Sequence, residues 1–300
     1  YFEQFPLSGD YAVGLSSSDL PGVYETITAA INDLNLRGAS GPVRFLLLDN
    51  NYNSETLPIA ITSWSGASAS NTLTIKPNTG VTSSISGNGN PAVFDINTGD
   101  YFILDGSNAI GGNSKDLTIS NTSSSSSTIR FINDARSNTI KNCIIKGSST
   151  SGINGVIFVS TTSGSSGNDS NLVQNNDITK NSGPPTICVY NNGTGTTSAS
   201  KNSDNKIIGN RIFDFFLRGF YDQGNSAGTL YESNEIFSVA SSTGFQVAFR
   251  VVGSGIEGFT FRNNYIHDLK TSASNLIYGI ELSEIQNSFT GEVYNNFISL

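Results

Sequence analysis

The 300-residue chain contains no methionine, one tryptophan, one histidine and two cysteines, and charged residues make up only 13% of it. With His267 as the single histidine, any Ser-His-Asp match is uninformative, and a catalytic triad has no support. Two cysteines do not make a disulfide framework. We therefore expect Cys143 and Cys188 to be unpaired thiols, with Cys143 facing outward.

Long apolar runs and excess positive charge are also missing. No stretch approaches the ~20 apolar residues of a membrane-spanning helix, so we expect no transmembrane segment. The net charge of −8 and a pI of about 4.6 argue against binding to nucleic acid or through a polybasic membrane patch. The sequence shows no signal peptide, as expected of a mature secreted protein.

The second half of the chain carries a repeat. The tripeptide Asn-x-Ile begins at positions 142, 176, 210, 234, 264 and 296, at intervals of 24 to 34 residues. In five of the six copies a large apolar residue stands three positions before the asparagine. A repeat of about 20–50 residues indicates stacked units. We therefore predict an all-β fold, a right-handed parallel β-helix (solenoid) with one turn per repeat.

Each repeat needs a sharp corner between two short strands. Asparagine tolerates the left-handed backbone conformation of such a corner, and stacked amides can form a hydrogen-bonded ladder. The isoleucine two residues later is then expected to point into the core. The predicted structural ladder consists of Asn142, Asn176, Asn210, Asn234, Asn264 and Asn296.

The N-terminal part is expected to differ from the repeats. Residues 1–22 are interpreted as an extended leader, and residues 24–36 are predicted to form an amphipathic helix with Ile27, Ile31 and Leu34 on one face. We expect this helix to cap the open end of the solenoid. The predicted domains are 1–40, leader and capping helix, and 41–300, a β-helix expected to continue beyond Leu300.

Several segments carry a resemblance to known proteins. They are Gly22–Ile27 with Ala29–Ile31, Gly41–Phe45, Thr72–Pro77 and Tyr101–Gly106. The whole chain resembles right-handed parallel β-helix proteins of the pectate-lyase-like kind. Its N-terminal third is similar to large surface proteins that certain Gram-negative bacteria export by type IX secretion. The resemblance implies an extracellular location and further C-terminal domains, and it implies no single activity.

Enzymes of this fold provide the first functional test. The Asn-Thr-Asp, Asp-Asp and Gly-His-Gly segments of polygalacturonase-like members do not occur here. Pectate-lyase-like members use clustered carboxylates to bind calcium, with an arginine or lysine as base. Asp95, Asp100 and Asp105 are spaced by five residues and are expected to lie on separate strands, which disfavours a calcium site. We expect no cofactor, with calcium as the alternative.

Strand alternation suggests one charged face. If Val247, Phe249 and Val251 point inward, Arg250 points outward. By the same rule the weak catalytic candidates are Arg218, Asp222, Arg250 and Glu281. The competing interpretation is a ladder of surface ion pairs.

Tyr190 and Phe220 are expected near this face as candidate glycan-binding aromatics, although aromatics in solenoids more often stack in the core. The Ser/Thr/Gly-rich segments 161–170 and 191–203 leave the same corner of adjacent turns and should form a lip beside it.

The function expected is that of a non-catalytic extracellular domain of a larger surface or secreted protein, with a structural, adhesive or glycan-binding role. The alternative is a polysaccharide lyase or glycoside hydrolase. The expected partners are a polysaccharide or another surface protein.

Overall fold

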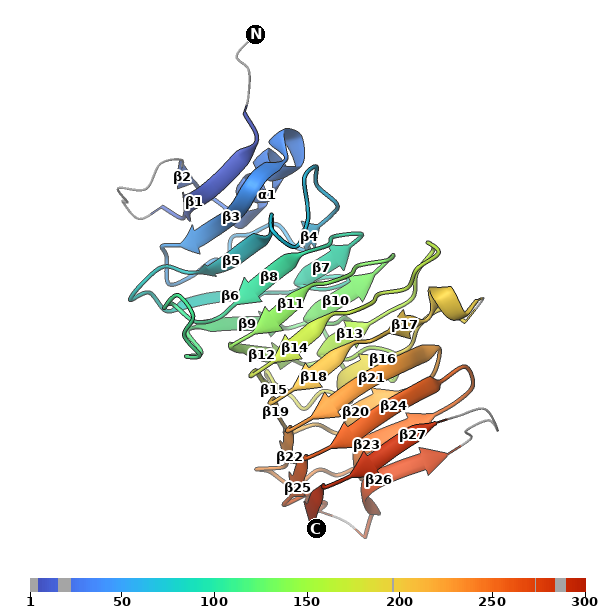
Figure 1. Cartoon of the computed structure of the whole chain (residues 1–300). Coiled ribbons are helices and arrows are strands. Elements are labelled where there is room, and N and C mark those ends of the chain that lie inside the picture. Colours follow the sequence, from blue (N-terminus) through green and yellow to red (C-terminus); the bar gives the residue numbers. More distant parts are fainter. Residues whose placement is uncertain (1–4, 16–22, 196, 273, 284–289) are drawn as a thin grey trace.

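The structure, a computed structural model, describes residues 5–15, 23–195, 197–272, 274–283 and 290–300. Within these ranges all paired strands are parallel, and they form three sheets along a solenoid of about nine turns (Figure 1). The predicted all-β parallel solenoid is confirmed. We name the sheets A, B and C. From β8 to β26 each turn passes through A, B and C in that order, with β17 as an additional short strand of A before β18. None of the helices in the described ranges is long and apolar enough to cross a membrane.

The strands of sheet A, in spatial order, are β2 (Val23–Tyr24), β1 (Leu7–Val13), β3 (Ala39–Leu47), β5 (Leu73–Pro77), β8 (Phe102–Asp105), β11 (Thr139–Lys141), β14 (Leu172–Gln174), β18 (Lys206–Ile208), β21 (Ser226–Glu232), β24 (Glu257–Arg262) and β27 (Gly291–Tyr294), with β17 (Asn202–Ser203) beside β21. Sheet B consists of β6 (Ser83–Gly87), β9 (Leu117–Asn121), β12 (Cys143–Gly147), β15 (Asp177–Lys180), β19 (Arg211–Phe213), β22 (Glu235–Phe237), β25 (Tyr265–His267) and β28 (Phe297–Ser299). Sheet C consists of β4 (Ile59–Ile61), β7 (Phe94–Asn97), β10 (Ile129–Ile132), β13 (Ile157–Val159), β16 (Ile187–Asn191), β20 (Arg218–Asp222), β23 (Gln246–Val252) and β26 (Ile277–Ser283).

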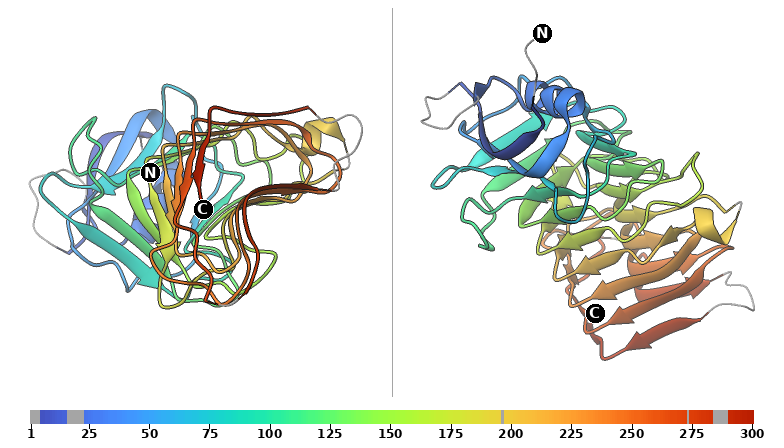
Figure 2. Two further views of the ribbon diagram at one scale, coloured as in Figure 1. Left: turned by 90° about the horizontal axis from the view of Figure 1, so that it is seen from below. Right: turned by 45° about the horizontal axis from the view of Figure 1, so that its top comes forward.

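Apolar side chains from all three sheets fill the interior. Because the strands pair in register, equivalent residues of successive turns stack on one another. In sheet A this column contains Ile140, Val173, Ile207, Tyr231 and Phe261, all of them buried. The apolar residues that precede the predicted corners therefore point inward, and viewed along its axis the solenoid has a bent, L-shaped cross-section (Figure 2).

Five of the six predicted asparagines form one column at the corner between sheets A and B. In this column the Nδ2 of each residue donates to the Oδ1 of the next at 3.0–3.1 Å, and the backbone N–H donates to the same oxygen at 2.9–3.0 Å. Each Nδ2 also donates to a carbonyl of the preceding turn at 2.9–3.0 Å. The column consists of Asn176, Asn210, Asn234, Asn264 and Asn296.

The prediction was wrong for the first copy of the repeat. The backbone N–H of Cys143, not of Asn142, donates to Oδ1 of Asn176 (2.9 Å), so Cys143 occupies the column position. Asn142 stacks instead on Asn175, whose Nδ2 donates to it at 2.8 Å. Cys143 is therefore buried rather than outward, and Ile145, not Ile144, enters the core. In the next turn both positions are asparagine, Asn175 and Asn176. The sequence alone therefore does not show which of the two is equivalent to Asn142.

The left-handed corner residue also differs from the prediction. It is the residue before each column asparagine, not the asparagine itself, that has a positive φ of 53 to 65°. This position tolerates several residue types that adopt the left-handed region at low cost. Its occupants are Asn142, Asn175, Gly209, Ser233, Asn263 and Asn295.

A second asparagine ladder lies at the other end of sheet A and was not predicted. Nδ2 of Asn138 donates to Asn171 at 3.0 Å, and Nδ2 of Asn171 donates to Asn205 at 3.1 Å. Each of these residues stands five positions before a residue of the first column: Cys143, Asn176 or Asn210. The paired spacing Asn-x4-Asn around a short apolar strand, as in Asn171–Asn176 and Asn205–Asn210, is the sequence signal that could have revealed both ladders.

The helix α1 (Ile27–Arg37) lies at the N-terminal end of the solenoid (Figure 2). It begins after Thr26, whose hydroxyl accepts from the N–H of Ala29 at 3.0 Å, and Glu55 accepts from the N–H of Ile27 at 2.6 Å. Its apolar face is buried, with Leu34 at 0% exposure, and joins the main core. The role of this helix as a cap remains a prediction.

The segment interpreted as a leader is partly a strand of the solenoid. β1 pairs with β3 over most of its length and with β2 at its end. An ion pair reinforces this pairing, because Arg44 of β3 holds Asp10 of β1 with contacts of 2.5 and 2.8 Å. The first third of the chain therefore belongs to the same stack of strands as the repeats.

Candidate functional site

Sheet C has apolar side chains on both faces. The inner ones belong to the main core, and a separate outer cluster lies on the opposite face. The predicted charged residues lie on the three sheet C strands that extend this face, β20, β23 and β26. The outer cluster consists of Phe158, Ile187, Tyr190, Tyr221 and Val252.

Strict alternation fails in these strands. In β20 the Cβ position of Gly219 faces the core residues Phe215 and Ile236, and the following Phe220 is itself a core residue. Two consecutive inward positions shift the pattern by one residue. Arg218 and Tyr221 therefore share the outer face although they are three residues apart.

The structure brings three of the four charged candidates together on this face. Guanidinium groups of Arg218 and Arg250 lie over the ring of Tyr221, at 4.5 and 5.3 Å from its centre. Arg250 also forms an ion pair of 3.0 Å with Glu281, although the angles are not those of a hydrogen bond. The Tyr221 ring continues a stack through Tyr190 to Phe158, with centroid distances of 5.4 and 4.8 Å.

Arg218 lacks an acidic partner on this face. Its side chain makes no ion pair or hydrogen bond to any residue that the structure describes, and its Nε is buried. Burial, and then the positive charge of Arg250, lower the pKa of Arg218 from its ordinary value. A half-buried guanidinium with unused donors is suited to bind a planar anion such as a carboxylate.

Asp222 does not belong to this face, which corrects the prediction. It is fully buried inside the solenoid because the shifted alternation turns it inward. Its carboxylate accepts from the hydroxyls of Ser226 (2.9 and 3.0 Å) and Tyr231 (3.1 Å) and from Nδ2 of Asn191 (3.2 Å). Burial raises the pKa of Asp222, whereas these hydrogen bonds act to lower it. The net result is a pKa of about 6.

The two predicted binding aromatics differ in position. Phe220 points into the core, where it packs edge-on against Tyr231 and Phe249, so it cannot line an outer groove. Tyr190 lies on the outer face but is covered, with 0% exposure, and its hydroxyl bonds to Gln223 and Asn192. Neither ring offers an open platform for a sugar.

The predicted lip is present. Segments 161–170 and 191–203 lie side by side, because the N–H of Thr162 donates to Oγ1 of Thr194 at 2.9 Å and Nδ2 of Asn168 donates to Asn202 at 3.0 Å. Both segments directly follow strands of sheet C.

The acidic residues considered for calcium are separated and individually paired. Asp95 forms a bidentate pair with Arg130 at 2.8 and 3.0 Å, Asp100 accepts from the backbone N–H of Arg136 at 2.7 Å, and Asp105 contacts Lys141 at 3.2 Å. Within the described ranges, no group of three or more histidine, cysteine, aspartate or glutamate residues is arranged to hold a metal ion.

Both ring nitrogens of His267 already contact carboxylates. Its ring stacks between Phe237 and Tyr265, at centroid distances of 5.1 and 4.1 Å, and its two nitrogens contact Glu235 (3.1 Å) and Asp268 (2.9 Å). The interactions place it in an ion-pair network on sheet B.

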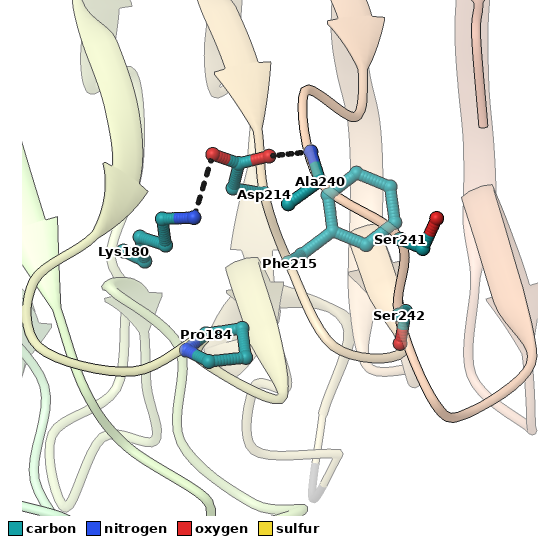
Figure 3. A pocket seen from close by; sticks show the side chains of 7 residues that line it. All are labelled: Lys180, Pro184, Asp214, Phe215, Ala240, Ser241 and Ser242. Carbon is teal, nitrogen blue, oxygen red and sulfur yellow. Dashed lines mark hydrogen bonds and ion pairs between the residues drawn. The ribbon is translucent and has the colours of Figure 1, made fainter. Parts of the chain in front are cut away.

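A pocket that sequence reasoning missed lies between the loops that connect sheets B and C (Figure 3). Its volume is about 150 Å³, and its floor includes Phe215 and Pro184. Asp214 pairs with Lys180 at 3.1 Å and accepts from the N–H groups of Val239 (2.8 Å) and Ala240 (3.1 Å). Since these charges and donors already satisfy one another, the pocket is a polar structural joint between successive turns.

Known structures share this fold, whereas no known protein family and no curated protein matches the sequence. A pectin methylesterase from Aspergillus niger aligns over 97% of this chain and 88% of its own, with 11% identity and a TM-score of 0.54. An alginate lyase from a Paenibacillus species aligns over 97% and 99%, with 12% identity and a TM-score of 0.50. Such low identities show the shared fold alone.

Proposed function

We propose that the chain is a non-catalytic, extracellular β-solenoid module of a larger surface or secreted protein, and that it binds an acidic polysaccharide. Its structural or adhesive role would follow from that binding. The observation that carries the proposal is the unpaired Arg218 guanidinium, held over Tyr221 on a face whose other charges are paired. A carboxylate on a sugar would supply the missing partner.

The arrangement of carboxyl groups supports the non-catalytic part. A glycoside hydrolase needs two carboxyl groups facing one substrate bond, about 5 to 9.5 Å apart. On the outer face of sheet C, Glu281 is paired with Arg250 and Asp95 with Arg130, while Asp222 is inside the solenoid. A lyase of the pectate-lyase-like kind uses a base beside a bound calcium ion, and the described residues show no cluster of carboxylates that could hold one.

The extracellular part rests on composition and resemblance. Few charges, many small polar residues and stacked turns fit a chain outside the cell, and the N-terminal third is similar to surface proteins exported by type IX secretion. Pectin and alginate appear in the names of two solved proteins that share this fold. They make polysaccharides a reasonable first set of ligands to screen.

The test combines binding and cleavage. We expect the protein to bind at least one carboxylated polysaccharide on a glycan array, and Arg218→Ala to weaken that binding at least tenfold. Arg211→Ala is the matched control, because Arg211 is an exposed arginine on sheet B that already pairs with Glu235.

Incubation of the ligand with and without calcium should release no unsaturated or reducing ends. Cleavage would favour the alternative, a polysaccharide lyase or glycoside hydrolase. Binding that Arg218→Ala leaves unchanged would remove this face from the proposal.

A further inference from the structure

A second cation, on sheet A rather than sheet C, is largely buried and has no bonded partner among the described residues. Lys76 lies on β5 of sheet A, between Ile75, which enters the core, and Pro77. It is only 4% exposed, and its side chain makes no hydrogen bond or ion pair to the described residues. Burial lowers the pKa of Lys76, whereas the nearby negative charge of Asp105 acts to raise it. An isolated buried ammonium is costly unless something compensates its charge.

The neighbouring charges are already used. Asp105, the carboxylate nearest in register, takes Lys141 at 3.2 Å, Nδ2 of Asn142 at 2.8 Å and the N–H of Ser107 at 3.1 Å. Asp10 is held by Arg44. The two ion pairs are neutral overall. Asp116, the other carboxylate whose charge acts on Lys76, accepts from the hydroxyl of Ser114 (2.6 Å) and the N–H of Asn108 (3.0 Å), so no described carboxylate is bonded to the Lys76 ammonium.

Lys76 lines a pocket of about 200 Å³. One wall is the outer face of sheet A, with Arg44 and Leu46, and the other comes from loops that carry Asn78, Thr79 and Asn108. The loop with Asn108 is fixed in place, because its Nδ2 donates to the carbonyl of Val81 at 3.2 Å and its backbone N–H donates to Asp116 at 3.0 Å. The pocket therefore combines one free cation with amide and hydroxyl groups.

We propose that this pocket binds a small monoanionic hydroxy acid, whose carboxylate pairs with Lys76 and whose hydroxyl groups face Asn78, Thr79 and Asn108. A single unpartnered ammonium group favours a ligand with one carboxylate, and the volume is below the ~300–1,000 Å³ of pockets for drug-sized ligands. The proposal is independent of the polysaccharide proposal, because the two sites lie on different sheets.

The test uses ligands that differ in charge but little in size. Glycerate and glycerol are titrated into the full chain by ligand-observed NMR, and inorganic phosphate is added as a competitor. We expect saturable binding of glycerate and none of glycerol. If phosphate displaces glycerate, the site accepts both phosphate and carboxylate groups. If phosphate does not displace it, the site is restricted to carboxylates.

Lys76→Met keeps the length of the side chain and removes the charge, and should weaken glycerate binding at least tenfold. Lys206→Met, an exposed lysine on β18 of the same sheet, should leave it unchanged. Circular dichroism and thermal unfolding establish that both variants fold. Equal binding by Lys76→Met and the original chain, equal binding of glycerol, or binding of neither anion would overturn the proposal.

Discussion

Each column asparagine links three turns through a single amide. In Asn210, for example, Oδ1 accepts two N–H groups of Asn176 in the preceding turn, while Nδ2 donates to the carbonyl of Val173 in that same turn and to Asn234 in the next. Because these groups are buried, removing the amide leaves several backbone groups without partners rather than simply losing one bond. The energetic importance of the column thus lies in the backbone groups that it satisfies.

We expect Asn210→Ala to lower the free energy of unfolding by about 1–3 kcal/mol, because it leaves buried backbone donors and acceptors unsatisfied. Denaturant-induced unfolding followed by circular dichroism measures the change. Asn88→Ala replaces an exposed asparagine in a turn and should change stability by no more than about 0.5 kcal/mol. Equal losses in the two variants would contradict a special role for the column.

Asp222 gives a pH dependence of known sign. Burial raises its pKa from 3.8 to about 6, so between these pH values the folded state holds a proton that the unfolded state releases. Stability therefore falls as pH rises through this window. Relative to Asp222→Asn, the unmodified chain should lose on the order of 2–3 kcal/mol between about pH 4 and pH 7. Parallel pH profiles for the two proteins would refute this assignment.

At the scale of elements, α1 contributes to stability through one face. Leu34 is fully buried in the main core, whereas Leu36, two residues away, is 73% exposed. Leu34→Ala should cost about 2–5 kcal/mol because it leaves a cavity, and Leu36→Ala should cost little. Thermal unfolding of both variants measures the difference. If both have the same midpoint as the unmodified chain, the helix is not part of the folded core.

Sequence reasoning succeeded where one residue type repeats at a fixed distance from an apolar position. Asn210 and Ile207 recur together, so corner, strand and inward direction could be derived at once. It failed at Asn142, because the neighbouring turn carries two adjacent asparagines and only pairing of the strands decides which one is equivalent. It failed again at Asp222, since a single extra inward residue, Gly219, reverses every direction that follows.

The pocket at Lys76 could not be predicted from local sequence for another reason. In the strand Leu73–Pro77 the lysine occupies an ordinary outward position. The pocket that it lines is bounded by a loop of the next turn that carries Asn108 and Ile110, about thirty residues later in the chain. A residue that is covered by a distant loop has no distinctive hydrophobic pattern in the sequence around it.

At the scale of the whole molecule, the interior is one continuous core, and both cysteines belong to it. Cys143 and Cys188 are fully buried, and burial raises the pKa of both thiols well above the ordinary value. Neither should react with a thiol reagent at neutral pH until the solenoid unfolds. We expect Cys143→Ala and Cys188→Ala, each with one remaining thiol, to be labelled at the same rate at a given denaturant concentration. Clearly different rates would show that the turns open independently.

The parallel stacking also gives the molecule a mechanical character. The hydrogen bonds of all three sheets run along the solenoid axis, so a pull on the two ends loads successive turns in series. Each folded turn spans about 4.8 Å of that axis, whereas its roughly thirty residues extend to about 100 Å. A turn that peels away under tension would therefore lengthen the chain about twentyfold, and the solenoid would act as a compact, extensible tether.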